Sequence, residues 1–535
     1  MIVPKRMKNI DTNEFCTVLG ITREVFEKKL KEATDYSRYK ASVFIKQMPL
    51  NEYAVLAERL YKYPGFYGQE RTLRKYPSPI AAHLLGYISE IDEKTLNKNK
   101  SYQKGEYIGV SGLEQQYETM LRGKPGVEVL LVDVHNSVQG HYKNGAHDTI
   151  PLNGTNLYIS IDKDLQEYGE KLMQNKKGGI VAIEPSSGEI LCMVSSPGYD
   201  PNLLIGRKRS DNYRMLVAND SLKPLFNRAL MAQYPPGSIF KLVQGLIGLE
   251  EGAITEHTSF PCNKSLVGCH NHPTAFNLTR GIQYSCNPYF FNVFRSLIQQ
   301  NKAKSIFKDS ELGLEEWYKY VKRFGFGRKL GIDFPVEKTG IVPDVNFYDK
   351  IYGHGHWAFS TIYSLGIGQG ELEINPLQMA NLSAIIANHG YYNIPHFIKS
   401  NAKNMQVPSK YKQRMNTGIK PEYFALVREA MRRVVEEPHG TARRARIQGI
   451  TVCGKTGTAQ NPHGDDHSVF IAFAPMKSPQ IAISVYIENA GFGGSWAAPV
   501  ASLMIEKYIN KDISDTLKEG RIINADFIHV NDEKE

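Results

Sequence analysis

The sequence contains no run of about 18 consecutive apolar residues, the length that a membrane-spanning helix requires. Residues 1–6 include a proline and two basic side chains, so the start also lacks the apolar centre of a secretory signal. We therefore expect the chain to form soluble, folded domains.

Cysteine is scarce, with six residues among 535. So few thiols cannot staple a chain of this size, and an apolar core has to hold the fold. The hydrophobic content of 41% and the charged content of 22% suit such a core. The length predicts two or more domains.

Positive charge exceeds negative charge by 10 at pH 7, but it is spread along the sequence. No zinc-finger, helix-turn-helix or RNA-binding pattern accompanies it, so we expect no nucleic-acid partner. The same excess would suit an anionic membrane or a lipid substrate that carries pyrophosphate.

The pattern of apolar residues changes near residue 156. Before it, helices are expected over 23–33 and 50–62. After it, alternation and turn residues predict strands, and two of them flank the turn at 185–188 as a hairpin. The expected strands are 157–161, 180–183, 190–194, 451–453, 469–473 and 481–487, with a helix over 498–508. This order predicts an α+β fold whose antiparallel sheet is assembled from distant segments and packed by helices.

Ser238 follows two prolines and a glycine and precedes a largely apolar run, which predicts a buried helix that starts at this serine. Lys241 lies three residues later, so both side chains share a helix face. A lysine whose pKa is lowered by burial can take the proton of a serine and make it a nucleophile. The pair therefore predicts acyl-transfer chemistry.

The spacing alone is weak evidence, because six other serines also have a lysine three residues later. These are Ser37, Ser101, Ser160, Ser305, Ser400 and Ser409. The surroundings of each pair have to decide between them.

Two further motifs favour Ser238. Lys455-Thr456-Gly457-Thr458 follows an apolar run and is expected late in a strand, whereas the Lys-Thr-Gly at 338–340 lies in a proline-bounded loop. Ser285-Cys286-Asn287 follows the nucleophile and opens an aromatic helix, whereas the Ser-Asp-Asn at 210–212 precedes it in a charged loop. The three motifs in this order are the signature of β-lactamases and penicillin-binding proteins.

Longer stretches resemble the class B penicillin-binding proteins, most closely the type called penicillin-binding protein 2. They are IGVSGLE at 108–114, LRG at 121–123, GIVAIEP at 179–185, GID at 331–333, GIGQG at 366–370 and PLQMA at 376–380. The resemblance implies an N-terminal dimerisation or pedestal module over 1–150, truncated at its start, and a transpeptidase domain over 151–512. The remainder, 513–535, is expected to be a charged tail that frays from about residue 511.

The resemblance also implies a role for each motif residue. Ser238, activated by Lys241, would attack the carbonyl between two D-alanines of a peptidoglycan stem peptide. Ser285 would relay the proton to the leaving amine, and Asn287 would orient Lys241 and the substrate amide. Lys455 would add positive charge near the substrate carboxylate and lower the pKa of Lys241.

The last motif would bind the substrate. Thr456, Gly457 and Thr458 are expected to line the binding site, with both threonine hydroxyls directed at the substrate carboxylate. The backbone N–H groups of Ser238 and Thr458 would form the oxyanion hole. Expected partners are stem peptides, β-lactams, a membrane cell-wall polymerase and the elongation machinery. The family acts at the periplasmic face of the inner membrane, but the family's membrane anchor is absent from these residues.

Three cysteines and two histidines cluster between and within the first two motifs. Three thiols and an imidazole fill a tetrahedral zinc shell, and a site closed by four protein ligands is structural. The resemblance adds a metal near this place, with the middle residue of the Ser-x-Asn motif as a ligand. The expected ligands are Cys262, Cys269, His272 and Cys286, with His270 as the substitute for His272. A Cys262–Cys269 disulfide and free buried thiols remain as alternatives.

Other functions use the same nucleophile. A serine β-lactamase or a β-lactam sensor needs no N-terminal module of about 150 residues, and the rate of acyl-enzyme release would separate it from a transpeptidase. A scaffolding subunit of a membrane polymerase is a third alternative, which intact catalytic motifs argue against.

Overall fold

The computed structural model describes residues 1–48, 50–70, 73–134, 138–399 and 406–529. The chain divides into two compact units, which we describe separately. The first contains residues 1–79, 86–157 and 200–218, and the second contains 80–85, 158–199 and the described chain from 219 onward. A single boundary near 150 does not capture this division, because 80–85 and 200–218 each pack with the unit that is more distant in sequence.

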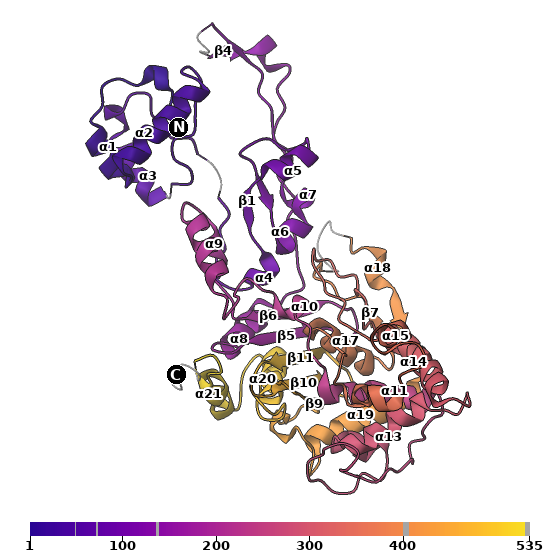
Figure 1. Ribbon diagram of the computed structural model, residues 1–535. Coiled ribbons are helices and arrows are strands. Elements are labelled where there is room, and N and C mark those ends of the chain that lie inside the picture. The colour runs from indigo at the N-terminus through magenta and orange to yellow at the C-terminus, as the bar shows by residue number, and fades with distance from the viewer. Residues whose placement is uncertain (49, 71–72, 135–137, 400–405, 530–535) are drawn as a thin grey trace. The chain divides into compact units, whose positions relative to one another are not determined.

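Helices α1 (Thr12–Leu19), α2 (Arg23–Tyr36) and α3 (Leu50–Ala57) open the first unit (Figure 1). Asp11 caps α1 by accepting hydrogen bonds from two backbone N–H groups, and Thr22 caps α2. The helices pack around an aromatic cluster centred on Phe15, whose ring lies 4.4 Å from Tyr63 and from Phe66. The expected helices are confirmed, although α3 stops at Ala57.

The rest of the first unit is made of short elements and two separate two-stranded sheets, β1–β2 and β3–β4. Its elements are β1 (Ile88–Glu90), α5 (Glu93–Lys98), β2 (Tyr107–Gly109), α6 (Gly112–Gln116), α7 (Glu118–Leu121), β3 (Leu130–Val132), β4 (Val138–His141) and α9 (Arg209–Ala218).

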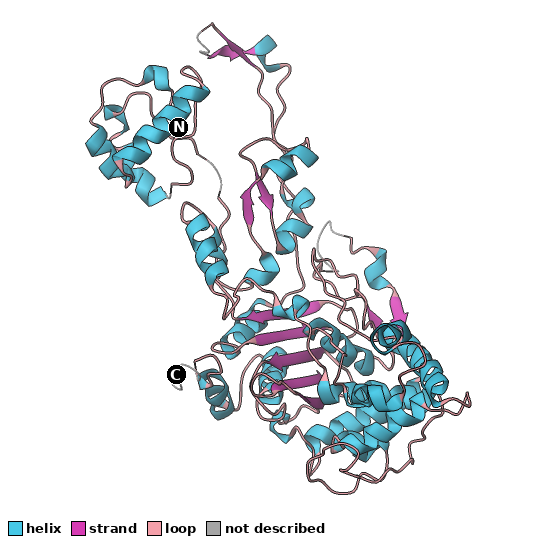
Figure 2. Cartoon of the chain, viewed as in Figure 1, coloured by secondary structure: helices cyan, strands magenta, loops and turns pink. Residues whose placement is uncertain are grey.

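A five-stranded antiparallel sheet with the order β6-β5-β11-β10-β9 forms the centre of the second unit (Figure 2). Its strands are β5 (Gly178–Ile183), β6 (Ile190–Ser196), β9 (Cys453–Ala459), β10 (His467–Ala474) and β11 (Ile481–Ile487). The expected hairpin and the sheet built from distant segments are confirmed. The strand expected over 157–161 is wrong: among the described residues this segment forms one isolated bridge, from Ile159 to Ile398, because its backbone hydrogen bonds there reach only Phe397 and Lys399.

Helices cover both faces of the sheet. On one face Ser484 donates a hydrogen bond to the first residue of α17 (Pro376–Ala387), which is buried along its whole length. On the other face Gly169 of α8 (Lys163–Leu172) packs against Val194 and against Met504 of α20 (Ala497–Asn510). Adjacent residues of a strand point to opposite faces, so the core lies on both sides.

A second group of helices surrounds the buried α11 (Lys241–Glu250). These are α12 (Leu278–Gln283), α13 (Asn287–Ile298), α14 (Ile306–Arg323) and α19 (Pro421–Glu436). The remaining elements are α4 (Ala82–Leu85), α10 (Arg228–Met231), α15 (Val345–Tyr352), α16 (Phe359–Ile362), β7 (Tyr391–Asn393), α18 (Ser409–Lys412) and β8 (Arg414–Asn416).

The chain after α20 differs from the expected frayed tail. It forms helix α21 (Thr516–Asn524), which Asp515 caps and which packs on α8 and α20. Ile522 is completely buried in this contact. The many charged residues made this segment look unstructured in the sequence, but α21 has one apolar face. That face is sufficient to pack a short helix against α8 and α20.

Among the described residues, no helix has the combination of length and apolarity that crossing a bilayer requires.

Candidate active site

The turn that carries Ser238 is a single 3-10 turn, η5 (Gly237–Phe240), and α11 begins directly after it at Lys241. Pro235 and Pro236 end the preceding chain, and Gly237 adopts a positive φ of 58° that favours glycine. Ser238 is half-buried, whereas Lys241 has no exposed surface. The predicted helix start is therefore shifted by three residues, and the serine stands just before the helix.

Two glycines allow the Ser238 turn to approach strand β9 closely. A Cβ atom on Gly237 would lie 2.7 Å from the Thr458 carbonyl oxygen, and one on Gly457 would lie 2.9 Å from the Pro236 carbonyl oxygen. A larger residue at position 237 or 457 would therefore force the backbone of the turn away from the backbone of β9. The backbone of the Ser238 turn thus lies against the backbone of Thr458, the two residues whose N–H groups are expected to bind an oxyanion.

Lys241 joins the first motif to the second. Its ammonium donates hydrogen bonds to the carbonyl oxygen of Ser285 at 2.8 Å and to Asn287 Oδ1 at 2.5 Å. The Ser285 hydroxyl lies 3.3 Å from the same nitrogen. Asn287 begins α13, as expected, and its Nδ2 donates to the Gly268 carbonyl at 2.7 Å. The amide of Asn287 is therefore fixed at both ends and orients Lys241.

Ser285 lies between the two lysines of the motifs. Lys455 Nζ donates to Ser285 Oγ at 2.8 Å and to the Thr456 carbonyl at 2.9 Å. Ser285 has a positive φ of 55°, which costs a residue other than glycine about 1–3 kcal/mol. This strained turn aims the hydroxyl at both ammonium groups, an arrangement suited to proton relay.

Burial is the main influence on both lysines. It lowers the pKa of Lys241 to about 8, against the nearby thiols of Cys269 and Cys286, which raise it. Burial also holds the pKa of Lys455 well below its usual range, and the charge of Lys241 lowers it further. A low-dielectric site that contains two amines disfavours the doubly charged state, so a neutral amine becomes available to accept a proton.

Strand β9 carries the third motif at the edge of the sheet. The motif was expected late in a strand over 451–453, but the strand starts at Cys453 and residues 455–458 lie in its middle. Thr456 and Thr458 are on one face, and Thr456 Oγ1 is 2.7 Å from Thr441 Oγ1. Gln369 Nε2 donates to the Thr458 carbonyl at 3.3 Å.

Thr441 could not be identified from the sequence, because it belongs to no motif. The residue reaches Thr456 only after α19 packs against β9. No local pattern signals that contact.

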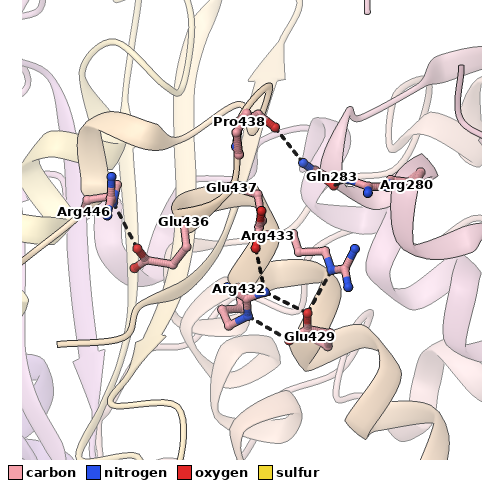
Figure 3. A network of polar contacts seen from close by, with 9 residues as sticks. All are labelled: Arg280, Gln283, Glu429, Arg432, Arg433, Glu436, Glu437, Pro438 and Arg446. Atoms are coloured by element: carbon pink, nitrogen blue, oxygen red, sulfur yellow. Dashed lines mark hydrogen bonds and ion pairs between the residues drawn. The ribbon is translucent and has the colours of Figure 1, made fainter. Parts of the chain in front are cut away.

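A polar network ties α12 to the turn that follows α19 (Figure 3). Gln283, two residues before Ser285, donates from Nε2 to the Pro438 carbonyl at 2.9 Å and accepts from Arg280 at 2.6 Å. On the α19 side Arg432 bridges Glu429 and Glu437. The network therefore links the segment that carries Ser285, which follows α12, to the segment after α19 that carries Thr441, the residue in contact with Thr456.

The four expected metal ligands come together beside the second motif. The ligand atoms of Cys262, Cys269, His272 and Cys286 all lie within 4.8 Å of one another. His272 Nε2 is 3.5 Å from Cys262 Sγ and 3.4 Å from Cys269 Sγ. All six cysteines of the chain are described and all are free, so the alternative Cys262–Cys269 disulfide is not formed.

The donor set fits zinc. A zinc ion about 2.3 Å from each sulfur in a tetrahedral shell separates its ligand atoms by about 3.8 Å. A hydrogen bond from Cys286 holds the pKa of the Cys269 thiol well below its usual range, and the same contact raises that of Cys286. The backbone N–H of Asn287 also points at Cys269 Sγ, at 3.4 Å. His272 Nδ1 is occupied by the Pro273 carbonyl, which leaves Nε2 for a metal.

Two family models match the chain. The model of the penicillin-binding protein transpeptidase domain matches residues 178–506, and the model of the penicillin-binding protein dimerisation domain matches residues 1–159. With the antiparallel sheet and its helices, these matches confirm the expected mixed α+β fold. The chain belongs to the class B penicillin-binding proteins.

Relatives named peptidoglycan D,D-transpeptidase MrdA show that the chain is of the penicillin-binding protein 2 type. The chain is 31% identical to the peptidoglycan D,D-transpeptidase MrdA of Acinetobacter baumannii, over 94% of this chain and 76% of that protein. It is 28% identical to MrdA of Escherichia coli K12, over 92% of this chain and 80% of that protein.

Two solved structures share the fold. PBP2 from Pseudomonas aeruginosa in complex with WCK 5153 has a TM-score of 0.67 and 29% identity and covers 82% of this chain and 90% of its own. PBP2 from Helicobacter pylori in complex with MreC has a TM-score of 0.75 and 26% identity and covers 94% of both chains.

Proposed function

We propose that the protein is a peptidoglycan D,D-transpeptidase that cross-links stem peptides through an acyl-enzyme on Ser238 during cell-wall elongation. The observation that carries this proposal is the buried chain of hydrogen bonds from Lys241 through Ser285 to Lys455, placed beside the Ser238 turn. Such an arrangement supplies a base, a proton relay and a positive charge to one half-buried hydroxyl.

In the first half-reaction the Ser238 oxygen attacks the carbonyl carbon between two D-alanines, while neutral Lys241 accepts the hydroxyl proton. The backbone N–H groups of Ser238 and Thr458 stabilise the negative oxygen that forms. The C–N bond then breaks, and the proton passes by way of Ser285 to the departing D-alanine amine. An ester on Ser238 remains.

In the second half-reaction an amine from a neighbouring stem peptide attacks this ester. As the new C–N bond forms, the amine loses a proton to neutral Lys241 by way of Ser285. The C–O bond to Ser238 then breaks, the serine oxygen takes that proton from Lys241, and the new amide is the cross-link. Before acylation, Lys455, Thr456 and Thr458 bind the terminal carboxylate of the donor peptide, which leaves with the released D-alanine. A β-lactam forms an ester on the same serine oxygen, because its ring amide is attacked in the same way and the C–N bond of the ring opens.

The lifetime of the acyl-enzyme tests this function against the β-lactamase alternative. We expect a fluorescent penicillin to label the protein with a stoichiometry near one and to leave it slowly. The label is measured by gel fluorescence after excess unlabelled penicillin is added. Rapid turnover, with hydrolysed penicillin accumulating, would identify a β-lactamase instead.

Zinc bound by Cys262, Cys269, His272 and Cys286 is part of the proposal. When bound, the ion would supply only structural cross-linking, since four protein ligands leave no position for substrate. The loop that carries Cys262, Cys269 and His272 contacts the predicted catalytic residue Asn287 directly. The Gly268 carbonyl and the Cys269 sulfur both accept hydrogen bonds from Asn287. Metal binding would therefore hold Asn287 in the position that orients Lys241.

Elemental analysis of the purified protein is expected to find about one zinc ion per chain. A Cys269→Ser variant should lose most of this zinc and unfold at a lower temperature, because ligand loss removes metal-binding energy from the folded state. Cys192→Ala, which alters a buried cysteine of the sheet, should retain the metal. Zinc-free wild-type protein with intact labelling would leave free thiols as the explanation of the cluster.

The proposed setting is the periplasmic face of the inner membrane, together with a membrane cell-wall polymerase. Two related structures support the partners: one is a complex of PBP2 with MreC, and another is described as a peptidoglycan synthase complex that coordinates polymerization and crosslinking. The latter shares 26% identity and a TM-score of 0.70 with this chain.

A further inference from the structure

The loop between β11 and α20 lies directly on the strands of the site. Ser468 of β10, which is fully buried, donates to the Phe492 carbonyl at 3.1 Å and accepts from the Ala497 N–H at 3.1 Å. A Cβ atom on Gly493 would lie 2.3 Å from the carbonyl oxygens of Gly457 and Val469. The loop backbone is therefore in contact with the backbone of β9 at the third motif.

The next residue of the loop reaches the proposed carboxylate-binding group. A Cβ atom on Gly494 would lie 2.3 Å from the Thr441 carbonyl and 3.8 Å from Thr456 Cγ2. Thr441 and Thr456 are joined by their hydroxyl groups. A shift of this loop would therefore displace the Thr456 side chain.

The segment after α20 holds the same loop from outside. Arg521 of α21 donates a hydrogen bond to the Ser495 carbonyl, and its guanidinium lies 4.5 Å from the centre of the Trp496 ring. The ring of Phe527 packs edge-on against Trp496 at 5.0 Å. Cation–π and aromatic contacts of this kind stabilise the position of the Trp496 ring.

This outer segment is itself anchored to the core. Lys176, at the turn before β5, has no exposed surface and donates to the carbonyls of Gln174 at 2.9 Å and Ala525 at 2.8 Å. The Phe527 N–H donates to the Asn175 carbonyl at 2.9 Å. A buried ammonium satisfied by main-chain carbonyls fixes the segment rigidly against the start of β5.

We propose that residues 516–529 are a brace that positions the β11–α20 loop against β9, with Arg521 as a positioning residue for acylation of Ser238. The inference rests on the proposed function and extends it, since the brace lies beyond residues 178–506, which the transpeptidase model matches. Arg521 acts through Trp496 and the loop on Thr456, so it sets the geometry of substrate binding.

The test compares second-order rate constants for acylation by a fluorescent penicillin, each normalised to the final labelled fraction. Arg521→Ala is expected to slow acylation about threefold, and Arg521→Ala combined with Phe527→Ala about tenfold, because one and then two contacts to Trp496 are lost. Arg521→Lys should recover part of the rate by keeping a cation over the ring. Hydrogen exchange of the Ser495 and Ala498 N–H groups should accelerate in the double variant.

Lys171→Ala is the matched control. Lys171 of α8 forms an ion pair of 3.7 Å with Glu519, which lies on α21 like Arg521, and the substitution removes this contact without changing a contact of the loop. Its normalised rate should equal that of the wild type. Equal rates for the wild type and the double variant would overturn the brace, as would an equal loss in Lys171→Ala. A wild type that is not acylated at Ser238 would instead refute the proposed function.

Discussion

A Ser238→Ala variant is expected to lose labelling by a fluorescent penicillin, with a decrease in the acylation rate of at least about 10⁴-fold. The hydroxyl of Ser238 supplies the atom that forms the ester, and no neighbouring group can replace it. Ser285, the other hydroxyl of the site, is held by both Lys241 and Lys455 and is 7% exposed. The measurement is gel fluorescence, with mass spectrometry of the intact protein to detect the adduct.

Ser305→Ala is the matched control for this experiment. Ser305 also has a lysine three residues later, Lys308, but it precedes α14 and Lys308 pairs with Glu311 on the helix surface. Its substitution should leave labelling unchanged. An adduct that persists in Ser238→Ala would remove this serine from the mechanism.

Lys241→Met is expected to slow acylation about 10³-fold, the typical contribution of a positioned general base. Methionine keeps the length of the side chain in its buried position but cannot accept a proton. In the wild type the acylation rate should rise with pH through about 8, because burial lowers the pKa of Lys241 to about 8 and only the neutral amine is a base. The variant should lose this rise.

Lys308→Met is the control for Lys241→Met, since it removes an exposed lysine that belongs to a pair with the same spacing. It should retain the wild-type rate and the wild-type dependence on pH. A wild-type rate that stays constant between about pH 7 and pH 9 would contradict Lys241 as the base. Both profiles are measured by stopped-flow mixing with penicillin.

The strained backbone of Ser285 is stabilised by the contacts of this residue with two lysines. The hydroxyl of Ser285 lies within hydrogen-bond distance of both Lys241 and Lys455, and the residue that carries it has a positive φ. Backbone strain of this kind persists where the surroundings determine the conformation completely. Here Asn287, the Gly268 carbonyl and the cysteine cluster provide those surroundings.

Much of the central fold could be predicted from local pattern. The hairpin around 185–188, the strands β10 and β11 and the helix α20 each have the apolar periodicity and turn residues of their type. The predictions failed where long-range packing decides. Residues 157–161 alternate like a strand but find only one bridging partner, and the charged segment after α20 contains an apolar face that docks as α21.

The site shows the same division. The three motifs, and the cysteines and histidine near them, could be identified from order and context, because the identity of each residue carries its chemistry. Thr441, Gln283 and the brace around Arg521 could not, since a threonine, a glutamine or an arginine acquires its role from the neighbour that it meets.

The order of the residues establishes which groups are available: a serine after a Pro-Pro-Gly turn, two lysines, a Ser-Cys-Asn turn and four side chains that can bind a metal. How these groups act together depends on long-range packing. Residues 238, 285 and 455 are far apart along the chain, and the sheet and the buried α11 bring them into one site. Burial at that site lowers the pKa of Lys241 to about 8, and burial is a property of packing that no local stretch of sequence possesses.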